Sequence, residues 1–122
     1  MTTMTPLTAN PKRGDVVLVL FPHSDLRTAK TRPALVVQAD DLDTGLPQII
    51  VAMITSRLFR ANHPSRVTIK LNSPEGARSG LLADSVVAAD NLATITNAAI
   101  ERIIGKIPMK KVDRALKHTL GL

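Results

Sequence analysis

Two polar, basic stretches of the sequence hold the side chains best suited to chemistry on a phosphate group. The first spans residues 21–33 and the second residues 54–60, and each begins where an apolar run ends. Together they carry five cations: Arg27, Lys30, Arg32, Arg57 and Arg60. Arginine presents a fixed fork of donors that matches phosphate oxygens, and nearby hydroxyls can add contacts. The pattern fits a phosphate site at the ends of two strands, and it equally fits two ordinary surface loops.

Other kinds of active site lack their residues in this sequence. There is no cysteine, which excludes thiol catalysis, disulfides and cysteine-type zinc sites. Neither a glycine-rich phosphate loop nor a Gly-x-Ser-x-Gly motif is present. His23, His63 and His118 lie in unlike settings and form no metal-ligand pair. The acidic segment 40–45 lacks EF-hand spacing and is typical of a turn, so we expect no metal and no other cofactor.

The overall charge favours a polyanionic partner. Sixteen Lys and Arg residues against ten Asp and Glu give a formal net charge of +6, which is typical of many small domains that bind nucleic acid. Phe21 and Phe59 are the only aromatic residues, whereas modules that bind single strands by stacking need aromatic platforms. Contacts to nucleic acid would therefore come from Arg, Lys, hydroxyl groups and backbone amides.

The chain length predicts a single domain. The 122 residues suffice for one two-layer core. Residues 1–11 are polar and rich in Thr and Pro, so they are predicted to be a flexible leader, followed by one domain over 12–122. The leader lacks the apolar segment of a signal peptide, and no run approaches the roughly 18 apolar residues of a membrane span. We therefore expect a cytoplasmic protein.

Short apolar runs predict a small, strongly curved antiparallel sheet or barrel. The expected strands lie at 16–21, 33–38, 48–55, 65–71 and 85–89. Residues 94–95 and 100–107 fit further strand, although the period of the second run fits helix equally well. Residues 23–31 and 76–80 are predicted to be loops.

The last segment has the pattern of a helix. Pro108 suits a first helical turn and Gly121 suits a stop. Between them, apolar residues recur at helical spacing, namely Met109, Val112, Ala115, Leu116 and Leu120. We expect this helix over residues 108–120, with these side chains in the core.

Five short motifs in order resemble the MazF/PemK family of toxin ribonucleases. They are RGDVV at 13–17, K-x-RPALVV at 30–37, ITS at 54–56, DSVV with D-x-L-x-TI at 84–95, and IGKI at 104–107. The resemblance extends over residues 12–120. The loop between Pro22 and Lys30 is poor in glycine, which is similar to the PemK-like branch.

The resemblance implies a fold and an assembly. The fold would be mainly β with α: a small SH3-like antiparallel β-barrel with a C-terminal helix. Such proteins work as homodimers, cleave single-stranded RNA without a metal, and are blocked by a cognate antitoxin. An acidic antitoxin tail would complement this basic surface.

The resemblance also assigns roles to residues. The catalytic arginine of the family maps onto Arg32, the catalytic threonine onto Thr55, and an acidic position onto Asp90. A basic position of one branch falls on Ala88, so this chain lacks it. The predicted RNA-binding residues are His23, Ser24, Arg27, Lys30, Ser56, Arg57, Arg60 and Asp90.

The implied reaction is attack of the RNA 2′-OH on its own phosphate, which gives a cyclic phosphate and a free 5′-OH. Arg32 would stabilise charge on the phosphate, with a hydroxyl contact from Thr55. An arginine is a poor base because its pKa exceeds about 12, so the acceptor of the 2′-OH proton stays open, with His23 as one candidate. We expect the loop at 23–31 to recognise the bases.

Two other functions fit the same sequence. Gyrase-inhibiting toxins of the CcdB type share this fold and act on a protein through the surface of the C-terminal helix, with no need of Arg32 and Thr55. A plain RNA-binding module would bind RNA with strong salt dependence and leave it uncut.

Overall fold

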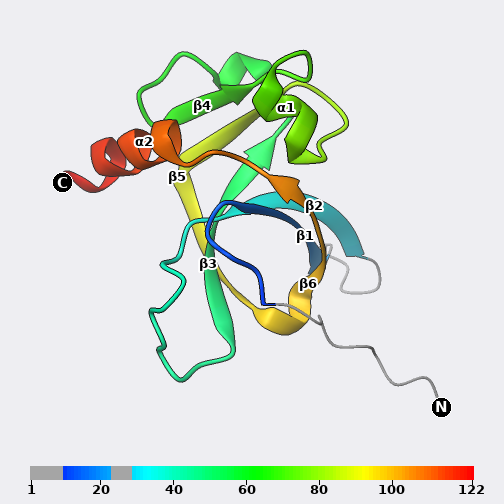
Figure 1. Cartoon of the computed structure of the whole chain (residues 1–122), viewed down its shortest axis with the longest axis vertical. Coiled ribbons are helices and arrows are strands. Elements are labelled where there is room, and N and C mark those ends of the chain that lie inside the picture. The colour runs from blue at the N-terminus through cyan, green and yellow to red at the C-terminus, as the bar shows by residue number, and fades with distance from the viewer. Residues whose placement is uncertain (1–9, 23–28) are drawn as a thin grey trace.

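The fold is built on one six-stranded antiparallel sheet, with a helix at the end of the chain (Figure 1). The structure is a computed structural model that describes residues 10–22 and 29–122. The strands are β1 (Asp15–Pro22), β2 (Ala29–Val36), β3 (Gln48–Thr55), β4 (Arg66–Ile69), β5 (Ser85–Thr96) and β6 (Ile100–Lys106). The helices are α1 (Pro74–Ser79) and α2 (Lys110–Leu120), with short 3-10 turns at Leu58–Arg60 and Asn97–Ala99. The predicted class, mainly β with a C-terminal helix, is confirmed.

Backbone pairing leaves the sheet open between its two edge strands. The strand order is β4-β5-β3-β2-β1-β6, so β4 and β6 are the edges, and no ladder among the described residues joins them. Helix α1 bridges this gap. A Cβ at Gly76 would lie 1.9 Å from the carbonyl oxygen of Lys70, just after β4, and one at Gly80 would lie 2.1 Å from that of Ile104 in β6. The backbone at Gly76 in α1 therefore packs against the segment just after β4, and the backbone at Gly80, just after α1, packs against β6. At both positions only glycine fits.

The side chains of the sheet divide into two apolar clusters because alternate residues of a strand point to opposite faces. The first cluster includes Val16 and Leu35 and extends to Val112 and Ala115 of α2. The second cluster gathers Val17, Val19, Ala34, Val36, Ile49, Val51, Ile95 and Ile100. Consecutive residues along β1, and along β2, thus belong to different clusters, whereas residues paired across the two strands share a cluster. This fixes the register of the strand pair.

Arg13, from the first sequence motif, ties the start of β1 to α2. Its guanidinium donates from Nε to the carbonyl oxygen of Val37 at 3.0 Å and from Nη2 to Asp113. Helix α2 begins at Lys110, two residues later than predicted, and ends at Leu120, where Gly121 caps it with a positive φ. Among the described residues, none of the helices combines the length and the apolar character needed to cross a membrane.

Three predicted elements differ from the structure. Residues 76–80 lie largely in α1, so the loop prediction was wrong there: Ser73 caps this helix by accepting a hydrogen bond from the amide of Gly76. Residues 29–31, also predicted as loop, open β2, while residues 23–28 of that loop and residues 1–9 of the leader lie outside the described part. The predicted strand at 85–89 and residues 94–95 form the single strand β5, and 100–106 is strand β6.

Candidate functional site

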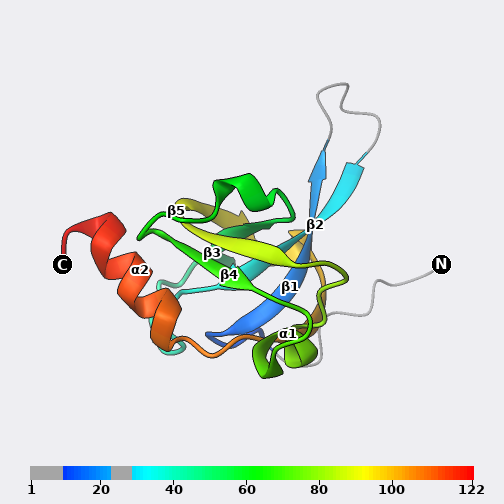
Figure 2. The same cartoon turned by 90° about the horizontal axis from the view of Figure 1, so that it is seen from above.

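A cavity of about 470 Å³ opens where β2 and β3 separate. The two strands pair only over Ala34–Val36 and Val51–Met53. Before Ala34, β2 continues beside β1, whereas beyond Met53, β3 continues beside β5. Figure 2 shows the paired ends of β1 and β2 extending away from the rest of the sheet. The space between the diverging strands is the β2–β3 cavity.

Arg32 and Thr55 occupy matching positions on the two sides of this cavity, and both line it. Arg32 lies two residues before Ala34, and Thr55 lies two residues after Met53, the last pair of the ladder. Because side chains alternate with a period of two, both residues lie on the face of the sheet that carries Ala34 and Met53. The structure therefore brings to one cavity two residues that are 23 positions apart in sequence.

The hydroxyl of Thr55 is oriented by its own backbone turn. Its Oγ1 accepts a hydrogen bond of 3.2 Å from the amide of Arg57. A hydroxyl that accepts through its oxygen keeps its proton for donation. Thr55 is half-buried at the end of β3, whereas Arg32 is exposed. The pair offers one hydroxyl donor and one guanidinium fork to a ligand in the cavity.

The cavity is strongly cationic. Lys30, Arg32, Arg57 and Arg102 line it, and among its described lining residues none is Asp or Glu. None of these four cations forms an ion pair with a described carboxylate. Close like charges repel unless an anion lies between them. The arrangement is therefore suited to phosphate groups, and of the predicted residues it brings together Lys30, Arg32, Thr55, Ser56 and Arg57.

Two predicted RNA-binding residues lie outside this cavity. Asp90 accepts two hydrogen bonds from the guanidinium of Arg66 in β4, at 3.2 Å and 2.6 Å. Arg60 places its guanidinium carbon 5.7 Å from the ring centre of Phe59, and its carbonyl oxygen accepts from Arg66. His23, Ser24 and Arg27 lie outside the described residues.

The contact with Arg66 changes the titration of Asp90. The hydrogen bonds from Arg66 hold the pKa of Asp90 below its ordinary value, and partial burial opposes this shift. The same hydrogen bond raises the pKa of Arg66. Asp90 is thus the charged partner of Arg66 in an ion pair at neutral pH.

Comparison with known proteins identifies the family. Residues 12–120 match the family described as "PemK-like, MazF-like toxin of type II toxin-antitoxin system". The chain belongs to this family. It is 35% identical over 118 residues to endoribonuclease EndoA of Bacillus subtilis (strain 168). The alignment covers 91% of this chain and 95% of that protein. The resemblance seen in the sequence motifs is confirmed.

Solved structures show the same fold as this PemK/MazF-like toxin. A mycobacterial endoribonuclease in complex with its cognate antitoxin superposes with a TM-score of 0.68 at 24% identity, covering 93% of this chain and 97% of that one. A MazE-MazF structure from Deinococcus radiodurans gives 0.69 at 20% identity, covering 92% and 96%. At these identities the likeness concerns the fold.

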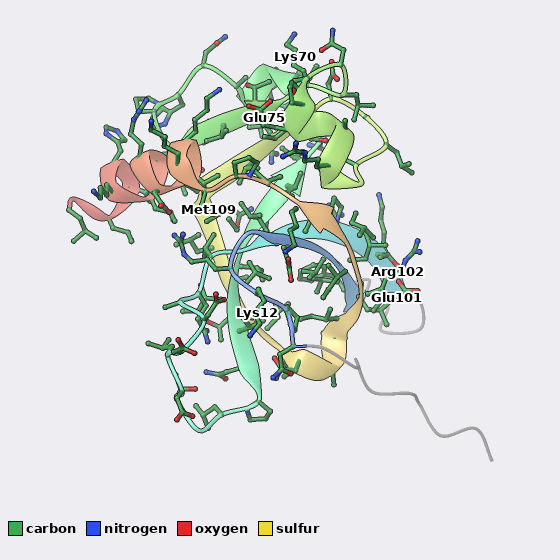
Figure 3. All side chains as sticks on the ribbon, viewed as in Figure 1. Lys12, Lys70, Glu75, Glu101, Arg102 and Met109 are labelled. Atoms are coloured by element: carbon green, nitrogen blue, oxygen red, sulfur yellow. The ribbon has the colours of Figure 1, made fainter. Side chains whose placement is uncertain are left out.

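Two parts of the cavity wall in this PemK/MazF-like toxin were missed by sequence reasoning. One is the segment after α1, including Leu81 and Leu82, which follows a helix that was predicted as a loop. The other is Arg102 in β6. The run 100–107 fits strand and helix equally by its period, so no face could be assigned to Arg102. In Figure 3, Glu101 and Arg102 lie beside the beginning of β2.

Proposed function

We propose that this chain is the toxin of a type II toxin–antitoxin system and cleaves single-stranded RNA at specific sequences without a metal ion. The observation that carries the proposal is the β2–β3 cavity, which Arg32 and Thr55 line together with Lys30, Arg57 and Arg102, with no Asp or Glu among its described lining residues. The 35% identity to a protein named an endoribonuclease supports the same activity. The products would be a cyclic phosphate and a 5′-OH end, and the effect would be to inhibit translation and growth.

In the proposed reaction the 2′-oxygen forms a bond to phosphorus while the bond from phosphorus to the 5′-oxygen breaks. The 2′-OH proton passes to a base and another proton goes to the leaving 5′-oxygen. Arg32 and the hydroxyl of Thr55 would bind the non-bridging oxygens, where negative charge increases in the transition state. Their fixed places on β2 and β3 would orient the phosphate for in-line attack. His23, a candidate base from the sequence, lies outside the described residues.

The remaining predicted contacts divide between phosphates and bases. Lys30, Ser56 and Arg57 line the cavity and would hold the RNA backbone beside the reacting phosphate. With so few aromatic residues in the chain, base recognition would depend on hydrogen bonds to splayed bases. We assign this role to the segment 23–31, with His23, Ser24 and Arg27. Arg60 and Asp90, placed outside the cavity, would at most contact RNA beyond it.

The family also suggests the setting in which the toxin works. We propose one toxin domain over residues 12–122 after a short leader, acting in the cytoplasm as a homodimer. A cognate antitoxin would neutralise it by covering the cationic cavity. The support is the family match over 12–120 and the related mycobacterial and Deinococcus radiodurans proteins whose structures contain their antitoxins.

The direct test is to incubate the purified chain with a long RNA in the presence of EDTA and to map the cut ends. We expect cuts at a short recurring sequence with 5′-OH ends. Thr55→Val keeps the branched shape but removes the hydroxyl, so it should cleave far more slowly, while Thr55→Ser should retain cleavage. Intact RNA, or cutting only after Mg²⁺ is added, would overturn the proposal. RNA bound with strong salt dependence but uncut would instead indicate an RNA-binding module.

A further inference from the structure

The cavity is larger than one phosphate needs, and its cations reach it from two sides. Its volume of about 470 Å³ lies within the range of sites that enclose a whole small ligand. Strand β1 separates β2, which carries Arg32, from β6, which carries Arg102. Neighbouring strands lie about 4.8 Å apart, so the backbones of these two arginines are about 10 Å apart.

The register of β1 places the two arginines on opposite faces of the sheet. Arg32 is paired with Val19, and Arg102 is paired with Leu18, the preceding residue of β1. Paired residues of antiparallel strands share a face, and consecutive residues of one strand point to opposite faces. Arg32 and Arg102 therefore enter the cavity from different directions, so they would contact different parts of a bound chain.

A bulge in β6 orients this segment. Leu18 pairs with Arg102 and the next residue, Val19, pairs with Ile100, so Glu101 is an extra residue on β6. Such bulges bend the strand and redirect side chains. The carboxylate of Glu101 accepts a hydrogen bond of 3.3 Å from the hydroxyl of Thr31 in β2. This hydrogen bond spans β1. Glu101, which precedes Arg102 in sequence, is thus bonded to a hydroxyl and forms no ion pair with Arg102.

We propose that Arg102 is an RNA-positioning residue that binds the phosphate next to the one that is cleaved. It is exposed, lines the cavity and has no ion pair with a described carboxylate. Successive phosphates of one RNA strand would then lie on Arg32 and on Arg102, with the sugar that carries the attacking 2′-OH or the leaving 5′-oxygen between them. This role rests on the proposed endoribonuclease activity and adds a contact to it.

The test uses the recognition sequence mapped with the wild-type protein. A short RNA with a 2′-deoxy nucleotide at the cleavage position binds but is not cut, so its Kd can be measured as a function of salt. Arg102→Ala should weaken binding about tenfold at low salt. It should also reduce the slope of log K against log salt by about 0.7, the value for one single-strand phosphate. Arg102→Lys should restore the slope and only part of the affinity.

A neutral methylphosphonate at each phosphate flanking the cleavage position locates the contact. At one flanking position, this change should weaken binding of the wild type as much as Arg102→Ala does, and should not weaken the variant further. The matched control is Arg114→Ala, which removes an exposed arginine of α2 outside the cavity and should behave as wild type. Arg102→Gln replaces Arg102→Ala if the alanine variant does not fold.

Three results would overturn the inference. The salt slope of Arg102→Ala could equal that of Arg114→Ala. It could be that no flanking methylphosphonate weakens binding of the wild type while leaving binding of Arg102→Ala unchanged. Arg102→Ala could lower the cleavage rate at saturating RNA while leaving Kd unchanged, which would place Arg102 at the cleaved phosphate itself. If the wild type neither cuts nor binds RNA, the proposed activity fails first, so the two failures are distinguishable.

Discussion

The arginines of this chain fall into two groups with opposite surroundings. Arg13 and Arg66 are held by carboxylates of the protein: Arg13 donates to Val37 and Asp113, and Arg66 forms a two-point contact with Asp90. Arg32 and Arg102 line the β2–β3 cavity and have no ion pair with a described carboxylate. The first group joins elements of the fold, while the second leaves its charge available to a ligand. The net charge alone does not distinguish these groups.

The largest effect should come from exchanging one arginine of each group for alanine. Arg32→Ala should lower the rate of RNA cleavage by about 10²–10³, the usual cost of losing one preorganised donor to a developing oxyanion. Its free energy of unfolding should stay within about 0.5 kcal/mol of wild type. Arg13→Ala should do the reverse, with near-normal cleavage per folded molecule and lower stability. Cleavage rates and denaturant unfolding measure both, and equal destabilisation by the two variants would break the distinction.

Much of the fold could be predicted from the sequence because its signals are local. The apolar runs of β1 and β3 and the helical spacing in α2 each lie within a dozen residues. Helix α1 was missed although Ser73, Pro74 and Gly80 are a cap, a first-turn proline and a stop, because six residues are too few for a helical period. The start of β2 at Ala29 was missed because its polar residues gain strand structure only from pairing with β1.

Residues of the candidate site could be proposed only where a motif marked them. Arg32, Thr55 and their neighbours follow from the resemblance, yet the cavity itself arises because β2 and β3 pair with each other over only three residue pairs and then separate, each staying beside its other neighbour. That divergence depends on long-range pairing, which no local pattern reports. The same holds for Asp90, whose partner Arg66 lies 24 residues away. Arg102 was missed because its face depends on the bulge at Glu101.

The next largest effect should connect the cavity with the fold. Gly80 ends α1 against β6 and lies in the cavity wall. In Gly80→Ala, the new Cβ would lie 2.1 Å from the carbonyl oxygen of Ile104 at a φ of +74°, so we expect a loss of at least about 2 kcal/mol of stability. RNA cleavage should fall with it. Gly45→Ala is the control, because Gly45 has a similar φ of +77° and a Cβ there would meet nothing within 4 Å. Its loss of stability measures the cost of the positive φ alone. Equal losses of stability in the two variants would show that the close approach of Gly80 to β6 is unimportant.

A smaller effect should follow from removing the carboxylate that holds Arg13. Asp113 is partly exposed and joins α2 to the start of β1. Asp113→Asn should cost about 1 kcal/mol or less, since exposed ion pairs contribute little and Arg13 keeps its bond to Val37. Hydrogen exchange in α2 should rise while RNA binding is unchanged. Weaker RNA binding in this variant would mean that the engaged arginines also serve the ligand.

The smallest effect should be the pH dependence of the Arg66–Asp90 pair. Hydrogen bonding from Arg66 lowers the pKa of Asp90 in the folded chain, whereas an unfolded Asp titrates near about 3.9. Between these two values the unfolded chain binds more protons, so stability rises with pH there and the contribution is complete above the unfolded pKa. Asp90→Asn should therefore be slightly less stable than wild type at pH 7. The difference should shrink as the pH falls through the folded pKa of Asp90. Urea unfolding of both proteins at pH 7, 4 and 3 measures this, and a difference that does not change with pH would show that Asp90 is not held by Arg66 in solution and is free to meet RNA.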